Sequence, residues 1–160
     1  MGRIYSVSFS GTVTNAGGDT DLLEVLPADD KPCKLRGFSL SQISEVGDAA
    51  EEGLRISVMR LPATVTSGNG TATTGQPVDS ADAAAGFAAE TNGATVATTS
   101  GTAVTLGEFG WNIRNSPFDF WYPDERFCPK AKQGEALIVR QQTTAADDYT
   151  AAMTFWIEEE

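Results

Sequence analysis

A sequence of 160 residues has the length of one domain and can bury a core of its own. It carries 22 Asp and Glu against 11 Lys and Arg, and the net charge of −11 argues against a nucleic-acid-binding surface, because phosphate contacts need clustered basic side chains. The chain has no His and only two Cys, which excludes the usual catalytic triads, His-ligated zinc sites and a structural zinc site.

Apolar residues are spread along the chain rather than gathered in one run. No segment approaches the roughly 18–20 apolar residues that span a bilayer. Serines interrupt the N-terminal MGRIYSVSFSG at every second position, so we expect no export signal. Cys33 and Cys128 are then expected as free buried thiols, and a disulfide stays open as the alternative if the fold brings them together.

Alternating residues predict a series of strands in the first part of the chain. Tyr5 and Val7 alternate with serines, which is typical of a strand with one buried face. Gly37 marks a change of phase within a longer strand, where a β-bulge would keep the apolar residues on both sides of it in the core. The strands expected here are separated by turn-rich segments and cover residues 3–13, 21–26, 33–43 and 54–61.

The middle of the chain is rich in Thr, Ser, Gly and Ala. Residues 62–77 contain nothing that needs burial and predict an extended surface loop. Residues 79–91 are the one good helix candidate, because Asp79 or Ser80 can cap the helix and Ala dominates its middle. The Thr-rich residues 94–106 that follow predict a hairpin, since β-branched side chains favour strands.

The chain has 3 Trp, 3 Tyr and 8 Phe, and half of these aromatic residues lie in the aromatic stretch, residues 109–128 (FGWNIRNSPFDFWYPDERFC). Alternation predicts a strand over 109–113 with one face in the core, and a short strand over 118–122. Prolines on both sides of the short strand place it at a sheet edge or rim, available to a neighbouring subunit. The residues predicted to form an interface or binding surface are Trp111, Phe118, Phe120, Trp121 and Tyr122.

Two last strands are expected over 135–142 and 149–158. In the second of them Trp156 lies on the polar face, where we interpret it as a packing partner for a loop. Eight or more short strands with regular turn signals and one short helix predict an all-β fold. We expect a single domain over residues 1–160, an antiparallel β-sandwich or jelly-roll-like barrel with long polar loops.

The acidic residues show no pattern that predicts catalysis. Glycosidase chemistry needs two carboxylates that converge from different strands, whereas the doublets of this chain lie in predicted turns. No EF-hand spacing, Walker A loop or GxSxG motif occurs, so we expect no enzyme, no catalytic residue, no cofactor and no metal site. A Ca²⁺ ion held by one acidic loop is the alternative to a solvated loop, and its ligands would be Glu45, Asp48, Glu51 and Glu52.

Two binding interpretations of the aromatic stretch stay open, beside the possibility that most of its rings are core. In the first, the rings form an oligomer or partner interface, for which aromatic residues are the usual anchors. In the second, Trp111 and Trp121 stack on sugar rings and nearby polar residues complete a carbohydrate-binding module. The polar residues available for such a site are Asn112, Asn115 and Asp119.

Five segments in a fixed order carry a resemblance over nearly the full length of the chain. They are RIYSVSFSGT, ADDKPCKLRGFSLSQISEVGDAAEEGLRISVMRL, DSADAAAGFAAETN, WNIRNSPFDFWYPDERFCPKA and the hairpin ALIVRQQ…YTAAMTFWIEEE. In this order the chain resembles small, acidic, β-rich virion proteins encoded in tailed-phage and prophage gene clusters.

The resemblance implies a non-enzymatic virion protein, made in the bacterial cytoplasm, that decorates or cements the capsid. Such a protein is a β-sandwich that oligomerises, often as a homotrimer, and binds the major capsid protein on the outside of the head. Neither nucleic acid nor a membrane is an expected partner. The alternative is a carbohydrate-binding module or a receptor-binding tail component with exposed Trp and Tyr, for which sugar would be the ligand.

Overall fold

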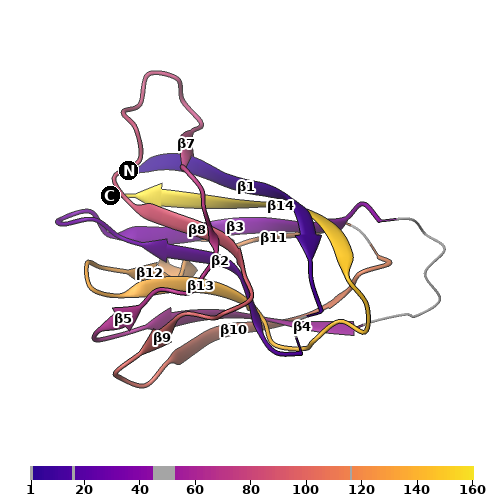
Figure 1. The fold of residues 1–160 in the computed structure, drawn as a ribbon. Helices are drawn as coiled ribbons and strands as arrows, with labels where there is room; N and C mark the ends of the chain where they lie inside the picture. Colours follow the sequence, from indigo (N-terminus) through magenta and orange to yellow (C-terminus); the bar gives the residue numbers. More distant parts are fainter. Residues whose placement is uncertain (1, 16, 45–52, 116) are drawn as a thin grey trace.

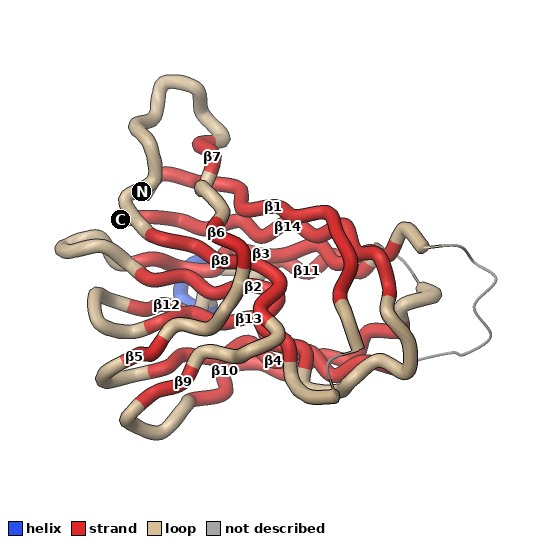
Figure 2. The backbone as a smooth tube through the Cα atoms, in the orientation of Figure 1, coloured by secondary structure: helices blue, strands red, loops and turns tan. Residues whose placement is uncertain are grey.

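The structure is a computed structural model and describes residues 2–15, 17–44, 53–115 and 117–160. Two antiparallel six-stranded sheets, called sheets A and B, pack face to face as a sandwich (Figure 1). The only helical element of the described residues is the 3₁₀ turn η1 (Glu125–Phe127), drawn in blue in Figure 2. The predicted all-β sandwich is therefore confirmed, and the sheets stay open rather than closing into a barrel.

Sheet A has the strand order β11-β3-β14-β1-β7, with the short β12 also paired to β3. Its strands are β1 (Arg3–Val13), β3 (Cys33–Gln42), β7 (Gln76–Pro77), β11 (Phe118–Trp121), β12 (Lys130–Ala131) and β14 (Tyr149–Glu159).

Sheet B has the strand order β10-β4-β13-β2-β8-β6. Its strands are β2 (Thr20–Leu26), β4 (Gly53–Leu61), β6 (Thr71–Ala72), β8 (Ala88–Gly93), β10 (Val104–Asn112) and β13 (Ala136–Gln141). A separate pair of short strands consists of β5 (Val65–Thr66) and β9 (Thr98–Thr99).

The central strands follow the order of a jelly roll. Sheet A contains β1-β14-β3-β11 and sheet B contains β2-β13-β4-β10, so the first and last long strands pair in one sheet and their chain neighbours pair in the other. Because β10 and β11 are the edge strands of their sheets and follow each other in the chain, they lie on the same side of the sandwich.

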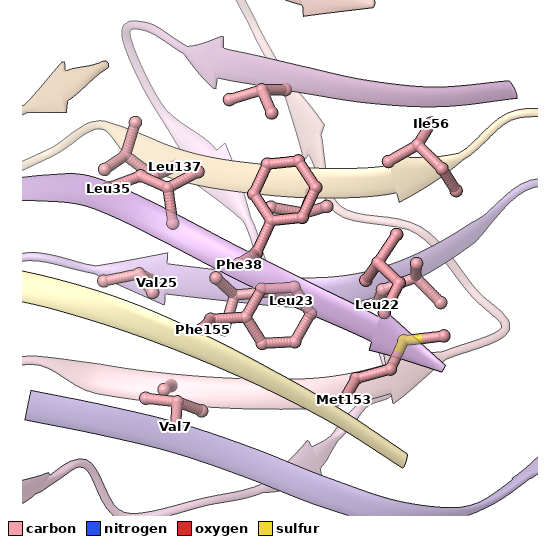
Figure 3. Close-up of a cluster of buried hydrophobic side chains, with 14 of the residues drawn as sticks. Val7, Leu22, Leu23, Val25, Leu35, Phe38, Ile56, Leu137, Met153 and Phe155 are labelled. Carbon is pink, nitrogen blue, oxygen red and sulfur yellow. The ribbon is translucent and has the colours of Figure 1, made fainter. Parts of the chain in front are cut away.

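The core lies between the two sheets and is built from the inward faces of the predicted strands (Figure 3). Tyr5 and Val7 are fully buried while the serines between them face outward. Arg36 is an extra residue of β3 opposite β14, next to Gly37, so apolar residues before and after this bulge all face the core. The phase change at Gly37 thus has the predicted structural cause.

No helix forms over residues 79–91, and this prediction was wrong. Asp79 closes a short turn by accepting a backbone N–H two residues further along, and β8 then pairs with β2. Phe87 enters the core edge-on to Tyr5, with ring centroids 5.5 Å apart. Phe87 is the single large apolar residue of the segment, so a helix would bury little, and pairing in the sheet outweighs the helix preference of Ala.

The hairpin predicted over 94–106 was also wrong, because the two halves of this segment pair elsewhere. β9 pairs with β5, and β10 pairs with β4 from Val104 onward. The stretch predicted as a surface loop over 62–77 contains the short strands β5, β6 and β7. The acidic residues considered as Ca²⁺ ligands, 45–52, lie outside the described residues.

Residues 62–70 and 94–101, called the outer layer, cover part of the outward face of sheet B. The Asp21 carboxylate accepts the Ala97 N–H at 2.7 Å and pairs with the Arg140 guanidinium at 2.5 Å. Arg140 in turn donates to the Ala97 carbonyl at 2.9 Å. These buried polar groups are satisfied by one another and attach the outer layer to the sheet.

Candidate binding surfaces

Trp111 does not reach the surface. It lies on the inward side of β10, is 2% exposed and meets Tyr149 edge-on, with ring centroids 5.9 Å apart. Of the five aromatic residues predicted to form a binding surface, Trp111 is therefore a core residue in the folded chain.

Phe118, Phe120 and Tyr122 close the core on the side where β10 and β11 meet. Phe120 packs on Phe109 of β10 with ring centroids 4.6 Å apart, and Phe118 packs on Phe38 at 6.1 Å. The Tyr122 ring meets Phe120 edge-on at 5.0 Å, and burial together with the charge of nearby Cys128 raises the Tyr122 pKa to about 12. The three rings are half-buried and join the edges of the two sheets.

Trp121 is the predicted site residue that faces solvent, with 53% of its surface exposed. Its ring lies over Gly37, where a Cβ atom would come within 2.9 Å of the ring and 2.5 Å of the Phe120 carbonyl. Trp156 lies opposite Gly37 on the other side of β3, and the two Trp ring centroids are 4.4 Å apart with an interplanar angle of 31°. The absence of a side chain at Gly37 allows this contact.

The free edge of sheet B is the second surface of interest. β10 pairs with β4 on one side and with no described strand on the other. A register shift between Thr105 and Gly107 places an irregularity at Leu106, whose side chain is 39% exposed, and Val104 is exposed two residues earlier.

Phe127, the last residue of η1, is a further exposed apolar side chain, with 64% of its surface in solvent. Val104 pairs with Arg60 of β4, and the Arg60 guanidinium donates to the backbone carbonyl of Lys130, three residues after Phe127. We call the exposed side chains of Val104 and Leu106 the β10 edge. It is an apolar group of side chains on an otherwise acidic molecule.

A shallow groove of about 410 Å³ crosses the outward face of sheet A. Its polar lining consists of hydroxyl side chains on three adjacent strands, β1, β14 and β3. Ser8 donates to Thr154 across the β1–β14 pair at 3.0 Å, and Ser41 donates to the Ala152 carbonyl at 2.6 Å. The hydroxyl side chains that line the groove are Ser8, Ser10, Ser39, Ser41 and Thr154.

Two of the carboxylate doublets, Asp124–Glu125 and Asp147–Asp148, contain residues with structural partners. Asp124 caps η1, and hydrogen bonds from the Arg126 guanidinium at 3.0 Å and from the Arg126 backbone N–H at 2.9 Å lower its pKa. Glu125 pairs with Lys34, and Asp148 accepts the Asn15 N–H at 2.6 Å. No group of three or more His, Cys, Asp or Glu side chains in the described ranges is arranged to hold a metal ion.

Cys33 and Cys128 are both buried and free, so they do not form a disulfide. Burial raises the pKa of the Cys33 thiol to about 12, and burial also raises the pKa of Cys128. Both side chains therefore stay protonated near neutral pH and act as small apolar groups in the core.

Comparison with family models, with curated proteins and with solved structures found no match for this chain. No helix of the described residues is long and apolar enough to cross a membrane.

Proposed function

We propose that this chain is a non-enzymatic structural protein of a phage virion, a decoration or cement protein of the head. It forms a homotrimer and binds the major capsid protein on the outer surface. The proposal is supported by the ordered sequence segments that resemble virion accessory proteins and, in the structure, by the β10 edge.

An unprotected edge strand is uncommon in a protein that works alone. Its unpaired N–H and C=O groups invite another chain, so monomeric sandwiches keep edges short, charged or covered. Three edges of this sandwich follow that rule, because β6 and β7 are two residues long and β11 is four. β10 has nine residues and carries the exposed side chains of Val104 and Leu106, and its bulge at Leu106 interrupts the edge at one position only.

The remaining surface favours one defined contact over nonspecific association. A net charge of −11 makes copies repel one another wherever their apolar groups do not meet. Contact through the β10 edge would bury Val104 and Leu106 and leave the acidic surface in water.

The assembly role of this edge can be tested with two matched variants and native mass spectrometry. Leu106→Lys places a charge on the β10 edge, whereas Val78→Lys makes the same charge change at a site that is 62% exposed beside β1. We expect the wild-type chain and Val78→Lys to be trimers and Leu106→Lys to be a folded monomer. A wild-type chain that is monomeric at all concentrations tested would contradict the proposed assembly.

A further inference from the structure

We propose that the outward face of sheet A binds a neutral oligosaccharide, which lies on the Trp121–Trp156 pair and is held by a row of polar side chains. This inference concerns a different surface from the β10 edge. It holds or fails independently of assembly on a capsid.

The two tryptophan rings stack on each other, and the exposed part of Trp121 forms the aromatic platform. The rings are in contact over Gly37, and Trp121 keeps 53% of its surface exposed. Covering a half-exposed indole with an apolar surface is favourable, because apolar area is removed from water. The C–H face of a pyranose ring supplies such a surface while its hydroxyl groups remain at the rim. The platform is therefore matched to a sugar ring.

A polar row runs parallel to this platform, two residues further along each strand. Asp119, Ser39, Thr154 and Ser8 are in register across β11, β3, β14 and β1. With strands about 4.8 Å apart, four positions span roughly 14 Å, and the platform lies about 6.7 Å away along the strands. Linked sugar rings on the platform would thus place their hydroxyl groups over this row.

The chemistry of the row suits hydroxyl groups. A serine or threonine hydroxyl both donates and accepts, and Asp119, an exposed carboxylate, can accept from two neighbouring hydroxyls. The Ser8–Thr154 hydrogen bond leaves each oxygen with capacity for a further partner. The groove beside the platform continues this lining with Ser10 and Ser41.

The charge of the face specifies a neutral ligand. Asp119 is the ionisable side chain of the polar row, and on the other side of the platform Arg36 is paired with Glu158 at 3.1 Å, so its charge is already balanced. An acidic glycan or a nucleic acid would meet the Asp119 carboxylate, an arginine that is already paired with Glu158, and the field of a chain with net charge −11. A protein partner would bury the hydroxyls of this face against apolar groups, at a cost for each one left unpaired.

Isothermal titration calorimetry of the full chain tests the inference. The probes are the neutral hexasaccharides of β-1,4-glucose, β-1,4-N-acetylglucosamine and β-1,4-mannose, with the hexasaccharide of galacturonic acid as the charged comparison. We expect saturable binding of at least one neutral probe and none of the charged one. Preference for the charged probe, or no binding of any neutral probe, would overturn the proposal.

Three variants locate the binding on this face. Trp121→Ala and Asp119→Asn are each expected to weaken the bound neutral probe at least tenfold, because they remove the platform ring and the bidentate acceptor. Val78→Ala removes an exposed apolar side chain elsewhere and is expected to leave the affinity unchanged. Circular dichroism checks that each variant is folded. Unchanged affinity in folded Trp121→Ala would refute the assignment of this face.

Discussion

Two tryptophans of the aromatic stretch differ in their surroundings and should differ in their contribution to stability. Trp111 is enclosed between the sheets, and Trp121 is half exposed above Gly37. Trp111→Ala leaves a large cavity and is expected to lower the free energy of unfolding by about 3–5 kcal/mol. Trp121→Ala should cost less than about 2 kcal/mol, because much of its surface is already in water.

Urea unfolding, monitored by far-ultraviolet circular dichroism, measures the free energy of unfolding of both variants. A second effect is expected in Trp121→Ala alone, namely the loss of oligosaccharide binding. A larger loss of stability in Trp121→Ala than in Trp111→Ala would show that the placement of the two rings is reversed.

Glu24 should give the protein a recognisable pH dependence. It accepts from the Ser67 hydroxyl at 2.8 Å and the Gly68 N–H at 3.1 Å, yet burial outweighs these bonds and raises its pKa. A carboxyl group with a folded pKa above its unfolded value of about 4.3 binds protons more tightly in the folded state. The free energy of unfolding therefore falls as the pH rises between the two pKa values.

Glutamine does not titrate, so comparing wild type with Glu24→Gln isolates the contribution of Glu24 to the pH dependence. The stability of wild type minus that of Glu24→Gln is expected to decrease from pH 4 to pH 7, measured by urea unfolding at each pH. An increase over the same range would mean that the hydrogen bonds lower the Glu24 pKa in the folded protein.

At the scale of elements, the outer layer is attached to sheet B through buried polar groups and through a small apolar cluster that includes Ala97 and Val65. Removing the Asp21 carboxylate leaves Arg140 buried without its charge partner, at an expected cost of about 3–5 kcal/mol. The Ala97 amide loses its acceptor in the same variant.

Hydrogen exchange measured by NMR distinguishes local unfolding of the outer layer from global unfolding of the sandwich. In Asp21→Ala we expect the Ala97 amide to lose its protection, while amides of β1 and β14 stay protected. Asp79→Ala removes an exposed turn carboxylate and should leave Ala97 protected. Equal loss of protection in β1 would show that the outer layer unfolds only with the whole sandwich.

The strands could be predicted from sequence because one-sided burial is visible directly. Tyr5 and Val7 alternate with serines, and the bulge next to Gly37 follows from a change in that alternation. The pairing partners of a strand are not visible in its own sequence. The pattern of residues 94–106 therefore predicts one hairpin, whereas β9 pairs with β5 and β10 pairs with β4. The residue pattern within a segment shows which side chains are buried, whereas the choice of the strand that pairs with it depends on the whole fold.

The same limit applies to the candidate site. The sequence predicts Trp121 as a surface residue and Trp156 as a packing partner for a loop, and nothing local connects the two. The two meet only because β3 lies between β11 and β14 with Gly37 in register with both. The inward direction of Phe118 and Phe120 was equally hidden, since an edge strand rich in aromatic residues can present either face.

For the whole molecule, the sandwich presents surfaces of different chemistry. The outer layer covers part of sheet B, the outward face of sheet A carries hydroxyls and two tryptophans, and the β10 edge is apolar. Assembly through the β10 edge would leave the sheet A face in solvent, because Trp121 and Trp156 point away from the sheet B side of the sandwich. A virion protein built in this way would make its protein contacts through the β10 edge and leave the outward face of sheet A exposed to solvent.

The most direct test of the proposed function is the amount of this chain in purified particles. Particles are prepared from the phage or induced prophage that encodes the chain, and its copy number is measured by mass spectrometry with isotope-labelled peptides against the major capsid protein. A decoration protein should be present in a fixed ratio to the capsid protein, with copies in multiples of three. Absence of the chain from intact particles would contradict the account.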